Sequence, residues 1–219
     1  MRLTCSAVIF DMDGTLVDST AVVERCWEHW GRQYGIPLTE ILRFSHGRPT
    51  LATMEHFRPG ADHSADAADM LRSEVADRSG IVAVRGAHAA VLACVGRPWA
   101  VVTSAPRELA EVRLKAAGLP IPDVMVTVEQ VHRGKPDPEG FLKAAEMLGT
   151  PPEQCIAFED TGPGVEAARR AGMHAVGLLT TVTREELGCD CVIRDFTDVR
   201  LTANGSGFLV DIYDLRNHT

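Results

Sequence analysis

The sequence predicts an α/β fold, a Rossmann-like doubly wound parallel sheet with a helical segment inserted after its first strand. Short apolar runs rich in β-branched residues alternate with helical patterns, and one long stretch near the start breaks that alternation. The runs fall at residues 7–10, 99–103, 124–127, 155–158, 175–179 and 191–193. Strands that alternate with helices indicate βαβ crossovers, and a parallel sheet buried on both faces explains why the runs are continuously apolar.

The segments between these runs show the spacing of amphipathic helices, with apolar residues recurring at intervals of three and four. Examples are Leu109, Val112, Leu114 and Ala117, followed later by Phe141, Leu142, Ala145 and Leu148. Near the carboxyl-terminal end, Asn204-Gly205-Ser206-Gly207 separates two strand-like runs, which predicts a β-hairpin.

The stretch from residue 17 to residue 84 contains no convincing strand. Helical patterns occur there at about residues 20–34, 50–57 and 64–77, and the chain returns to the core near residues 80–86. We therefore expect a core made of residues 1–16 and 85–219, with an inserted helical domain of residues 17–84. Trp27 and Trp30, three residues apart, are expected to pack within that insertion.

Composition and charge limit the possible partners. A formal charge of −8 and a pI near 5.5 provide no excess positive field for nucleic acid or an anionic membrane, so we expect a small-molecule partner. Six cysteines without a Cys-x-x-Cys pair are typical of a reducing cytosol. The chain starts directly in a strand-like region, so we expect no signal peptide, and no apolar run approaches the roughly 18 residues of a membrane span. These features predict a cytoplasmic protein, which we expect to be a monomer or a weak dimer.

The first strand ends in two acidic residues, within the segment VIFDMDGTLVDST. Residues two apart at the end of a strand point roughly the same way, so Asp11 and Asp13 should enter the crevice where open α/β sheets bind ligands, and Gly14 lets the backbone turn. Converging carboxylates repel each other, and Mg²⁺ is the leading candidate to relieve that repulsion. A calcium loop fails because Leu16 and Val22 stand where it needs glycine and glutamate. The alternative is a turn with a solvated aspartate pair.

A second acidic pair repeats this pattern in CIAFEDTGPGVEAARRAG, where Glu159 and Asp160 follow another apolar strand and precede a glycine-rich helix start. Because the carboxyl ends of parallel strands meet at one edge of the sheet, the two pairs predict a composite cation site.

Two further segments bring groups that suit a phosphate. Thr103 and Ser104 end a strand just before Pro106 opens a helix, so hydroxyl and backbone N–H groups could hold a phosphate there, although Thr-Ser before proline is also an ordinary helix cap. Lys135 stands before another helix start in RGKPDPEGF and is one of only three lysines in the chain. A plain surface role is the alternative for this lysine.

The order of these motifs resembles that of the haloacid dehalogenase-like superfamily. DMDGTLVDS, VVTSAP, RGKPDP and FEDTGPGVEAARRAG are similar to its four motifs, and the match covers nearly the whole chain. Within the superfamily, the chain resembles the sugar-phosphate and polyol-phosphate phosphatases that carry a small helical cap after the first strand. HGRPT and HF in the insertion, and GLP at residues 118–120, support this narrower placement.

The resemblance implies a role for each motif residue. Asp11 would be the nucleophile that is transiently phosphorylated, and Asp13 the general acid/base whose backbone carbonyl also binds magnesium. Thr103, the backbone of Ser104 and Lys135 would hold the transferring phosphoryl group. The implied Mg²⁺ ligands are Asp11, Asp13, Glu159 and Asp160, with Glu159 binding directly or through water. One departure is DTGPG, which stands where many relatives have Asp-Ser-Pro-Ala-Gly; it puts only the fine geometry of this loop in question.

Elementary chemistry agrees with this assignment. A carboxylate that attacks a phosphate dianion meets like-charge repulsion, which a divalent cation and a lysine offset. An acid must then protonate the leaving alkoxide and later accept a proton from water, and Asp13 lies beside the nucleophile.

Because the core motifs recognise only the phosphoryl group, the insertion is expected to read the rest of the substrate. The candidates are His46 and Arg48, with Arg43 and His56 as weaker ones. The alternative is that these side chains line a solvated face of the insertion.

The same residues leave two alternative functions open and disfavour two others. A phosphomutase of the β-phosphoglucomutase type shares all four motifs, and a non-catalytic Mg²⁺- or phosphate-binding regulator could use the same fold. A dehalogenase is disfavoured because such relatives lack the second aspartate, and phosphonate cleavage needs a lysine in the insertion, whereas the first lysine here is Lys115.

Overall fold

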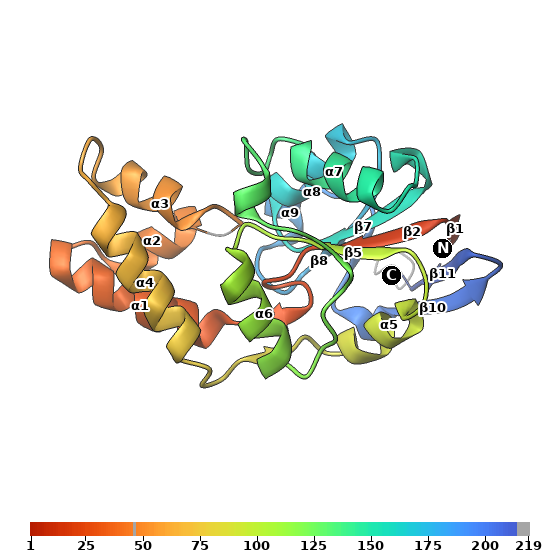
Figure 1. The fold of residues 1–219 in the computed structure, drawn as a ribbon, viewed down its shortest axis with the longest axis horizontal. Coiled ribbons are helices and arrows are strands. Elements are labelled where there is room, and N and C mark those ends of the chain that lie inside the picture. The colour runs from red at the N-terminus through yellow and green to blue at the C-terminus, as the bar shows by residue number, and fades with distance from the viewer. Residues whose placement is uncertain (46, 214–219) are drawn as a thin grey trace.

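The computed structural model describes residues 1–45 and 47–213, and it places a lobe containing a sheet beside a lobe built of helices (Figure 1). The sheet is parallel and six-stranded, in the order β6-β5-β2-β7-β8-β9. Its strands are β2 (Ala7–Phe10), β5 (Trp99–Val102), β6 (Val124–Val126), β7 (Cys155–Glu159), β8 (His174–Leu178) and β9 (Val192–Ile193). The predicted fold class is confirmed, and each apolar run of the sequence is a strand of this sheet.

The strand order places β2 at the point where the direction of winding reverses. From β2 the chain moves outward through β5 and β6, then returns to the other side of β2 and continues through β7, β8 and β9. The crevice beyond the carboxyl ends of strands at such a switch point is where open α/β sheets bind ligands. The residues that follow β2 and β7 therefore lie where a ligand is expected.

Helices cover both faces of the sheet, because successive strand residues point to opposite sides. Alanines and Ile9 pack against α7 (Glu139–Met147) and α8 (Gly162–Arg170) on one face. Larger side chains, including Phe10 and Phe158, pack on the other face with α5 (Ala87–Cys94) and α6 (Arg107–Ala116). Figure 1 shows the first pair of helices above the sheet and the second pair below it.

The helical lobe consists of α1 (Thr20–Tyr34), α2 (Leu38–Ser45), α3 (Thr50–Phe57) and α4 (Ser64–Ala76). The indole rings of Trp27 and Trp30 pack edge to face with centroids 5.4 Å apart, and both side chains are buried, so their expected packing role is confirmed. Trp30 also donates its indole N–H to Asp66 of α4 over 3.0 Å. This hydrogen bond joins the first and last helices of the lobe.

The expectation that residues 17–84 contain no strand is wrong. Strand β3 (Val17–Asp18) pairs in an antiparallel way with β4 (Val82–Ala83), at the two places where the chain passes between the lobes. Two residues are too few to show an alternating pattern, so this ribbon leaves no signal in the sequence. We retain the division into a core of residues 1–16 and 85–219 and a cap of residues 17–84 as a proposal.

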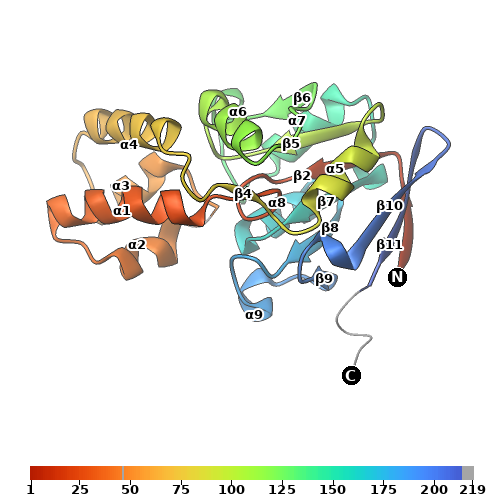
Figure 2. The same cartoon turned by 90° about the horizontal axis from the view of Figure 1, so that it is seen from below.

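A separate antiparallel sheet lies at the end of the molecule opposite the helical lobe (Figure 2). It contains β1 (Arg2–Cys5), β10 (Val199–Asn204) and β11 (Gly207–Ile212), with β11 in the middle. The predicted hairpin at residues 204–207 is confirmed, whereas β1 was not predicted as a strand of its own. Short helical segments complete the described chain: α9 (Arg184–Leu187), η1 (Val128–Gln130), η2 (Pro152–Gln154) and η3 (Phe196–Asp198). Within the described residues, no helix has the length and apolar character that a bilayer crossing requires.

Candidate active site

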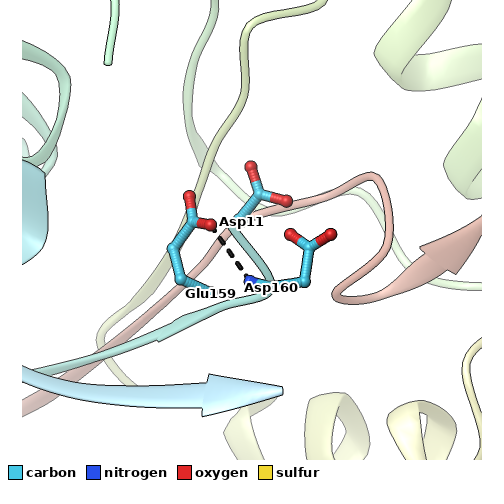
Figure 3. A group of neighbouring side chains, drawn as sticks. All are labelled: Asp11, Glu159 and Asp160. Atoms are coloured by element: carbon cyan, nitrogen blue, oxygen red, sulfur yellow. Dashed lines mark hydrogen bonds between the residues drawn. The ribbon is translucent and has the colours of Figure 1, made fainter. Parts of the chain in front are cut away.

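Three carboxylates meet at the carboxyl ends of the two central strands. Strands β2 and β7 are paired in register from Ala7 to Phe10, and the N–H of Asp11 donates to the carbonyl of Phe158 over 2.9 Å. This pairing brings Asp11 beside Glu159 and Asp160, with a carboxylate oxygen from each within 4.8 Å of the others. Figure 3 shows the three side chains gathered at this edge of the sheet. All three residues are buried.

Lys135 supplies the positive charge inside this cluster. Its ammonium contacts Oδ1 of Asp11 and Oε1 of Glu159, and its side chain is almost fully buried. Although burial opposes the charge, the carboxylates of Asp11 and Glu159 raise the pKa of Lys135 above its ordinary value. The lysine therefore stays protonated and neutralises part of the negative charge.

One ammonium does not balance three buried carboxylates. Burial, together with the charges of Glu159 and Asp160, raises the pKa of Asp11 well above its usual range, despite the opposing effect of Lys135. Burial and the charge of Glu159 raise the pKa of Asp160 to about 7. A divalent cation is the usual way to hold such a group of oxygens ionised, and carboxylate oxygens are the ligands that Mg²⁺ prefers.

The backbone around the cluster leaves room for these carboxylates only because two glycines carry no side chain. Gly14 has φ +82°, and a Cβ atom there would collide with Oδ2 of Asp160. A Cβ atom at Gly164 would collide with the carboxylate of Glu159. Oε2 of Glu159 accepts hydrogen bonds from the N–H groups of Asp160 and Thr161, over 3.0 and 3.2 Å, which fixes its orientation. The cluster is a built set of oxygen donors that fits a hard cation.

A cavity of about 330 Å³ lies between the cluster and the helical lobe. Asp11, Asp13, Thr103, Ser104 and Asp160 line it from the core. From the other side it is lined by residues of the helical lobe: Ser19, Thr20, Val23, Glu24, Trp27, Leu42, Ser45, Gly47, Arg48, Thr50 and Glu74. A ligand in this cavity would touch both lobes.

Thr103 and Ser104 lie at the end of β5, where the phosphoryl-binding prediction places them. Oγ1 of Thr103 accepts a hydrogen bond from the N–H of Ala105 over 3.1 Å, and among the described residues its own O–H has no acceptor. The hydroxyl of Ser104 donates to the carbonyl of Gly47 over 3.2 Å, which joins the core to the loop between α2 and α3. Lys135 reaches Asp11 from beside a second cavity of about 20 Å³, which Thr103 also lines.

The Asp13 side chain lies outside the group of three carboxylates. Its Oδ1 accepts a hydrogen bond from Ser19 over 2.7 Å, and its Oδ2 accepts one from Nη1 of Arg113 over 2.9 Å. Both carboxylate oxygens therefore have partners in the wall of the main cavity. This position suits a group that transfers protons at the side of the leaving group rather than one that binds a metal through its side chain.

The predicted residues of the helical lobe do not all come together. Arg48 lines the main cavity, with its guanidinium 4.5 Å from the centroid of the Phe44 ring. His56 stacks on the same ring, with centroids 3.8 Å apart, which is a packing contact. Arg43 is not among the residues that line this cavity in the described part of the chain. His46, the other main candidate, lies outside the described residues.

Some residues of the site were not predicted from the sequence. Arg113 of α6 and Glu74 of α4 are buried and line the cavity, yet neither belongs to any of the four motifs. Thr15 donates its hydroxyl to Oδ1 of Asp160 over 3.2 Å. Thr15 belongs to the first motif and could have been singled out there, whereas Arg113 and Glu74 look like ordinary residues of amphipathic helices.

Comparison with known proteins gives consistent matches over this fold and site. The family described as haloacid dehalogenase-like hydrolase matches residues 5–172. Hexitol phosphatase A of Escherichia coli strain K12 is 37% identical over 214 residues, covering 95% of this chain and 99% of that protein. Validoxylamine A 7'-phosphate phosphatase of Streptomyces hygroscopicus subsp. limoneus is 40% identical over 204 residues, covering 88% and 94%. The crystal structure of a hydrolase from Pseudomonas syringae superposes with a TM-score of 0.77 at 28% identity, covering 89% of this chain and 95% of that one.

Proposed function

This chain belongs to the haloacid dehalogenase-like hydrolase family, and from that membership we propose that it is a Mg²⁺-dependent phosphatase of a small sugar phosphate or polyol phosphate, working through an aspartyl-phosphate intermediate. The observation that carries this proposal is the position of Asp11. Its carboxylate lies among Glu159, Asp160 and Lys135, at the inner end of a cavity large enough for a phosphorylated metabolite.

The proposed reaction has two displacements at phosphorus. In the first, an oxygen of Asp11 attacks the phosphorus atom as the bond from phosphorus to the ester oxygen breaks. The ester oxygen takes a proton from the carboxyl group of Asp13, so the leaving group departs as an alcohol. Water then attacks the same phosphorus and gives its proton to the carboxylate of Asp13. Inorganic phosphate departs, and the carboxylate of Asp11 is restored.

The residues around Asp11 would hold the phosphoryl group during both steps. Thr103 and Lys135 would donate hydrogen bonds to its oxygens, together with the backbone N–H of Ser104. Asp11, Glu159 and Asp160 would hold Mg²⁺ through their carboxylates, and Asp13 through its backbone carbonyl. When bound, the ion supplies positive charge that offsets the repulsion between the nucleophile and the phosphate dianion.

The cap of residues 17–84 would recognise the body of the substrate. Its part of the cavity wall combines the indole of Trp27 with polar and charged groups that include Glu24 and Arg48. Apolar surface together with hydrogen-bonding groups suits a polyhydroxylated carbon chain or ring. Relatives named as phosphatases of hexitol phosphates and of validoxylamine A 7'-phosphate support a substrate of this class. The cytoplasmic location and the monomeric or weakly dimeric state stay predictions.

A substrate panel tests the proposal directly. Phosphate release is measured from hexose phosphates, hexitol phosphates, glycerol 1-phosphate and p-nitrophenyl phosphate, in Mg²⁺ and in EDTA. We expect release from sugar and polyol phosphates in Mg²⁺, the highest kcat/KM for one of them, and loss of activity in EDTA. A phosphomutase would instead convert one sugar phosphate isomer into another without net release, and a phosphate-binding regulator would do neither. Full activity in EDTA would remove the metal from the proposal.

A further inference from the structure

A buried arginine links the acid/base carboxylate to the cap. Arg113 belongs to α6 of the core and is only 4% exposed. Its Nη1 donates to Oδ2 of Asp13 over 2.9 Å, and its Nη2 donates to Oε1 of Glu74 over 2.8 Å. Glu74 belongs to α4 of the cap and is also buried. One guanidinium group therefore holds a carboxylate from each lobe.

We propose that Arg113 and Glu74 are positioning residues for Asp13. They orient its carboxyl group so that this group can protonate the leaving oxygen only while the cap packs on the core. This inference rests on the proposed function, since it needs Asp13 to act as the acid. It adds that residues outside the four motifs, one of them in the cap, set the orientation of that acid.

Stability alone is a weak explanation for this arrangement. A buried ion pair loses much of its attraction to the desolvation of both charges, and apolar residues of similar volume often replace it without loss. The Nε atom of Arg113 is buried without a hydrogen-bond partner among the described residues. An unsatisfied buried donor adds to the cost of this arrangement and further weakens an explanation by stability alone.

The geometry also shows why the position of the cap would matter to Asp13. The planar guanidinium holds Nη1 and Nη2 in a fixed relation. A shift of Glu74 therefore turns the whole group and moves the N–H that donates to Asp13. The other oxygen of Asp13 is held by Ser19, at the start of the cap. With a partner on each oxygen, the Asp13 carboxylate has one orientation while both partners are in place.

The leaving group offers a readout that a merely structural role would not change. When the bond from phosphorus to the ester oxygen breaks, the electron pair stays on that oxygen, and an alkoxide needs a proton at that moment. A p-nitrophenolate ion leaves without one. The ratio kcat/KM reports only the steps up to the first irreversible one, so it excludes hydrolysis of the aspartyl phosphate. Loss of correct positioning of Asp13 should therefore lower kcat/KM for alkyl phosphates more than for p-nitrophenyl phosphate.

The experiment compares the wild type with Arg113→Met on sorbitol 6-phosphate, glycerol 1-phosphate and p-nitrophenyl phosphate. General acid catalysis contributes about 10²–10⁴-fold, so we expect the alkyl-to-aryl ratio of kcat/KM to fall by about tenfold or more, and equally for both alkyl esters. Glu74→Gln keeps a neutral acceptor for Arg113 and should lower the ratio less. Arg113→Lys should restore only part of it, because one ammonium cannot hold both carboxylates as the guanidinium does.

Further variants keep the result interpretable. Glu74→Met/Arg113→Met removes both buried charges at similar volume, so it tests the ratio even if Arg113→Met alone folds poorly. In an Asp13→Asn background, Arg113→Met should cause no further fall in the ratio, because the group that it positions no longer carries a proton to give. Arg32→Met, which removes an exposed ion pair of α1, is the matched control and should leave the ratio unchanged.

An unchanged ratio in folded Arg113→Met and in the double variant would overturn the inference, and so would a parallel fall for all three esters. A fall for sorbitol 6-phosphate alone would also overturn it, because Arg113 would then read the substrate body. These outcomes differ from failure of the proposed function, in which the wild type itself would release no phosphate from any ester.

Discussion

At the scale of single residues, a substitution at Asp11 should remove activity without reducing stability. Asp11→Asn keeps the size of the side chain but cannot form an acyl phosphate, so we expect kcat to fall on the order of 10⁴-fold or more. Because burial opposes the charge of Asp11, the amide should leave the melting temperature of the metal-free protein unchanged or raise it. Phosphate release and thermal unfolding are the two measurements. Asp123→Asn, an exposed change in the loop before β6, is the control. Near-normal turnover in folded Asp11→Asn would contradict the nucleophile assignment.

Substitution of Gly14 provides a second test, with Gly172 as its matched control. Gly14 has φ +82° and Gly172 has φ +85°, so an alanine at either position pays a similar backbone penalty of about 1–2 kcal/mol. A Cβ atom at Gly14 would collide with Asp160, whereas one at Gly172 has nothing within 4 Å. We therefore expect Gly14→Ala to weaken Mg²⁺ activation by about tenfold or more, and Gly172→Ala to lower stability alone. Titration of activity with Mg²⁺ in both variants checks this; equal activation constants would show that the space at Gly14 does not matter for the metal.

The residues that the sequence could identify are those whose chemistry is tied to a local pattern. Asp11, Glu159 and Asp160 each follow an apolar strand directly, and strand ends of a parallel sheet meet at one edge, so their convergence was predictable. Arg113 and Glu74 meet because α6 packs against α4 across the boundary between the lobes. That packing depends on the tertiary arrangement, and a helical pattern does not reveal which charged residue turns inward.

At the scale of elements, the same distinction separates the helices that were predicted from those that were not. The boundaries of α1 and α3 agree with the predicted ranges, and in α1 the apolar spacing continues along the helix. Helix α5 was missed because AHAAVLAC is apolar almost throughout and shows no period of three to four. Helix α2 was also missed, although it has eight residues, as α3 does, and is amphipathic, so its length does not explain the omission. Only the uniformly apolar segment lacks a periodic signal.

The loop between α2 and α3 is the element that we expect to read the substrate body. Arg48 in this loop lines the cavity, and a charge-assisted hydrogen bond to a sugar hydroxyl contributes about 1.5–3 kcal/mol. Arg48→Ala should thus lower kcat/KM for sorbitol 6-phosphate by roughly ten- to a hundredfold. Glycerol 1-phosphate and p-nitrophenyl phosphate reach this loop less and should change less. This pattern differs from the one expected for Arg113, which separates alkyl from aryl esters. Equal losses on all three esters would mean that Arg48 does not discriminate between substrate bodies.

At the scale of the whole molecule, the buried carboxylates link stability to pH and to the metal. In the unfolded chain an aspartate releases its proton near pH 3.9, whereas burial raises the pKa of Asp160 in the folded protein to about 7, and that of Asp11 in the same direction. Between these values the folded protein binds more protons than the unfolded one, so its stability falls as pH rises. The stabilising contribution is complete below about pH 4 and is lost as the pH passes through about 7.

We therefore expect the metal-free protein to melt at a lower temperature at pH 8 than at pH 5, and Mg²⁺ to raise the melting temperature more at pH 8. The metal competes with protons for the same oxygens and stabilises only the folded state. His174 acts in the opposite direction, since burial lowers its pKa and its contribution to stability is lost as pH falls. We therefore compare the difference between the melting temperatures with and without Mg²⁺ at each pH, because the contribution of His174 cancels in this difference. Potassium chloride at matched ionic strength controls for screening. A Mg²⁺ effect that is equal at pH 5 and pH 8 would mean that the ion binds away from Asp11 and Asp160, because a site built on these two carboxylates must lose protons before it can hold the metal.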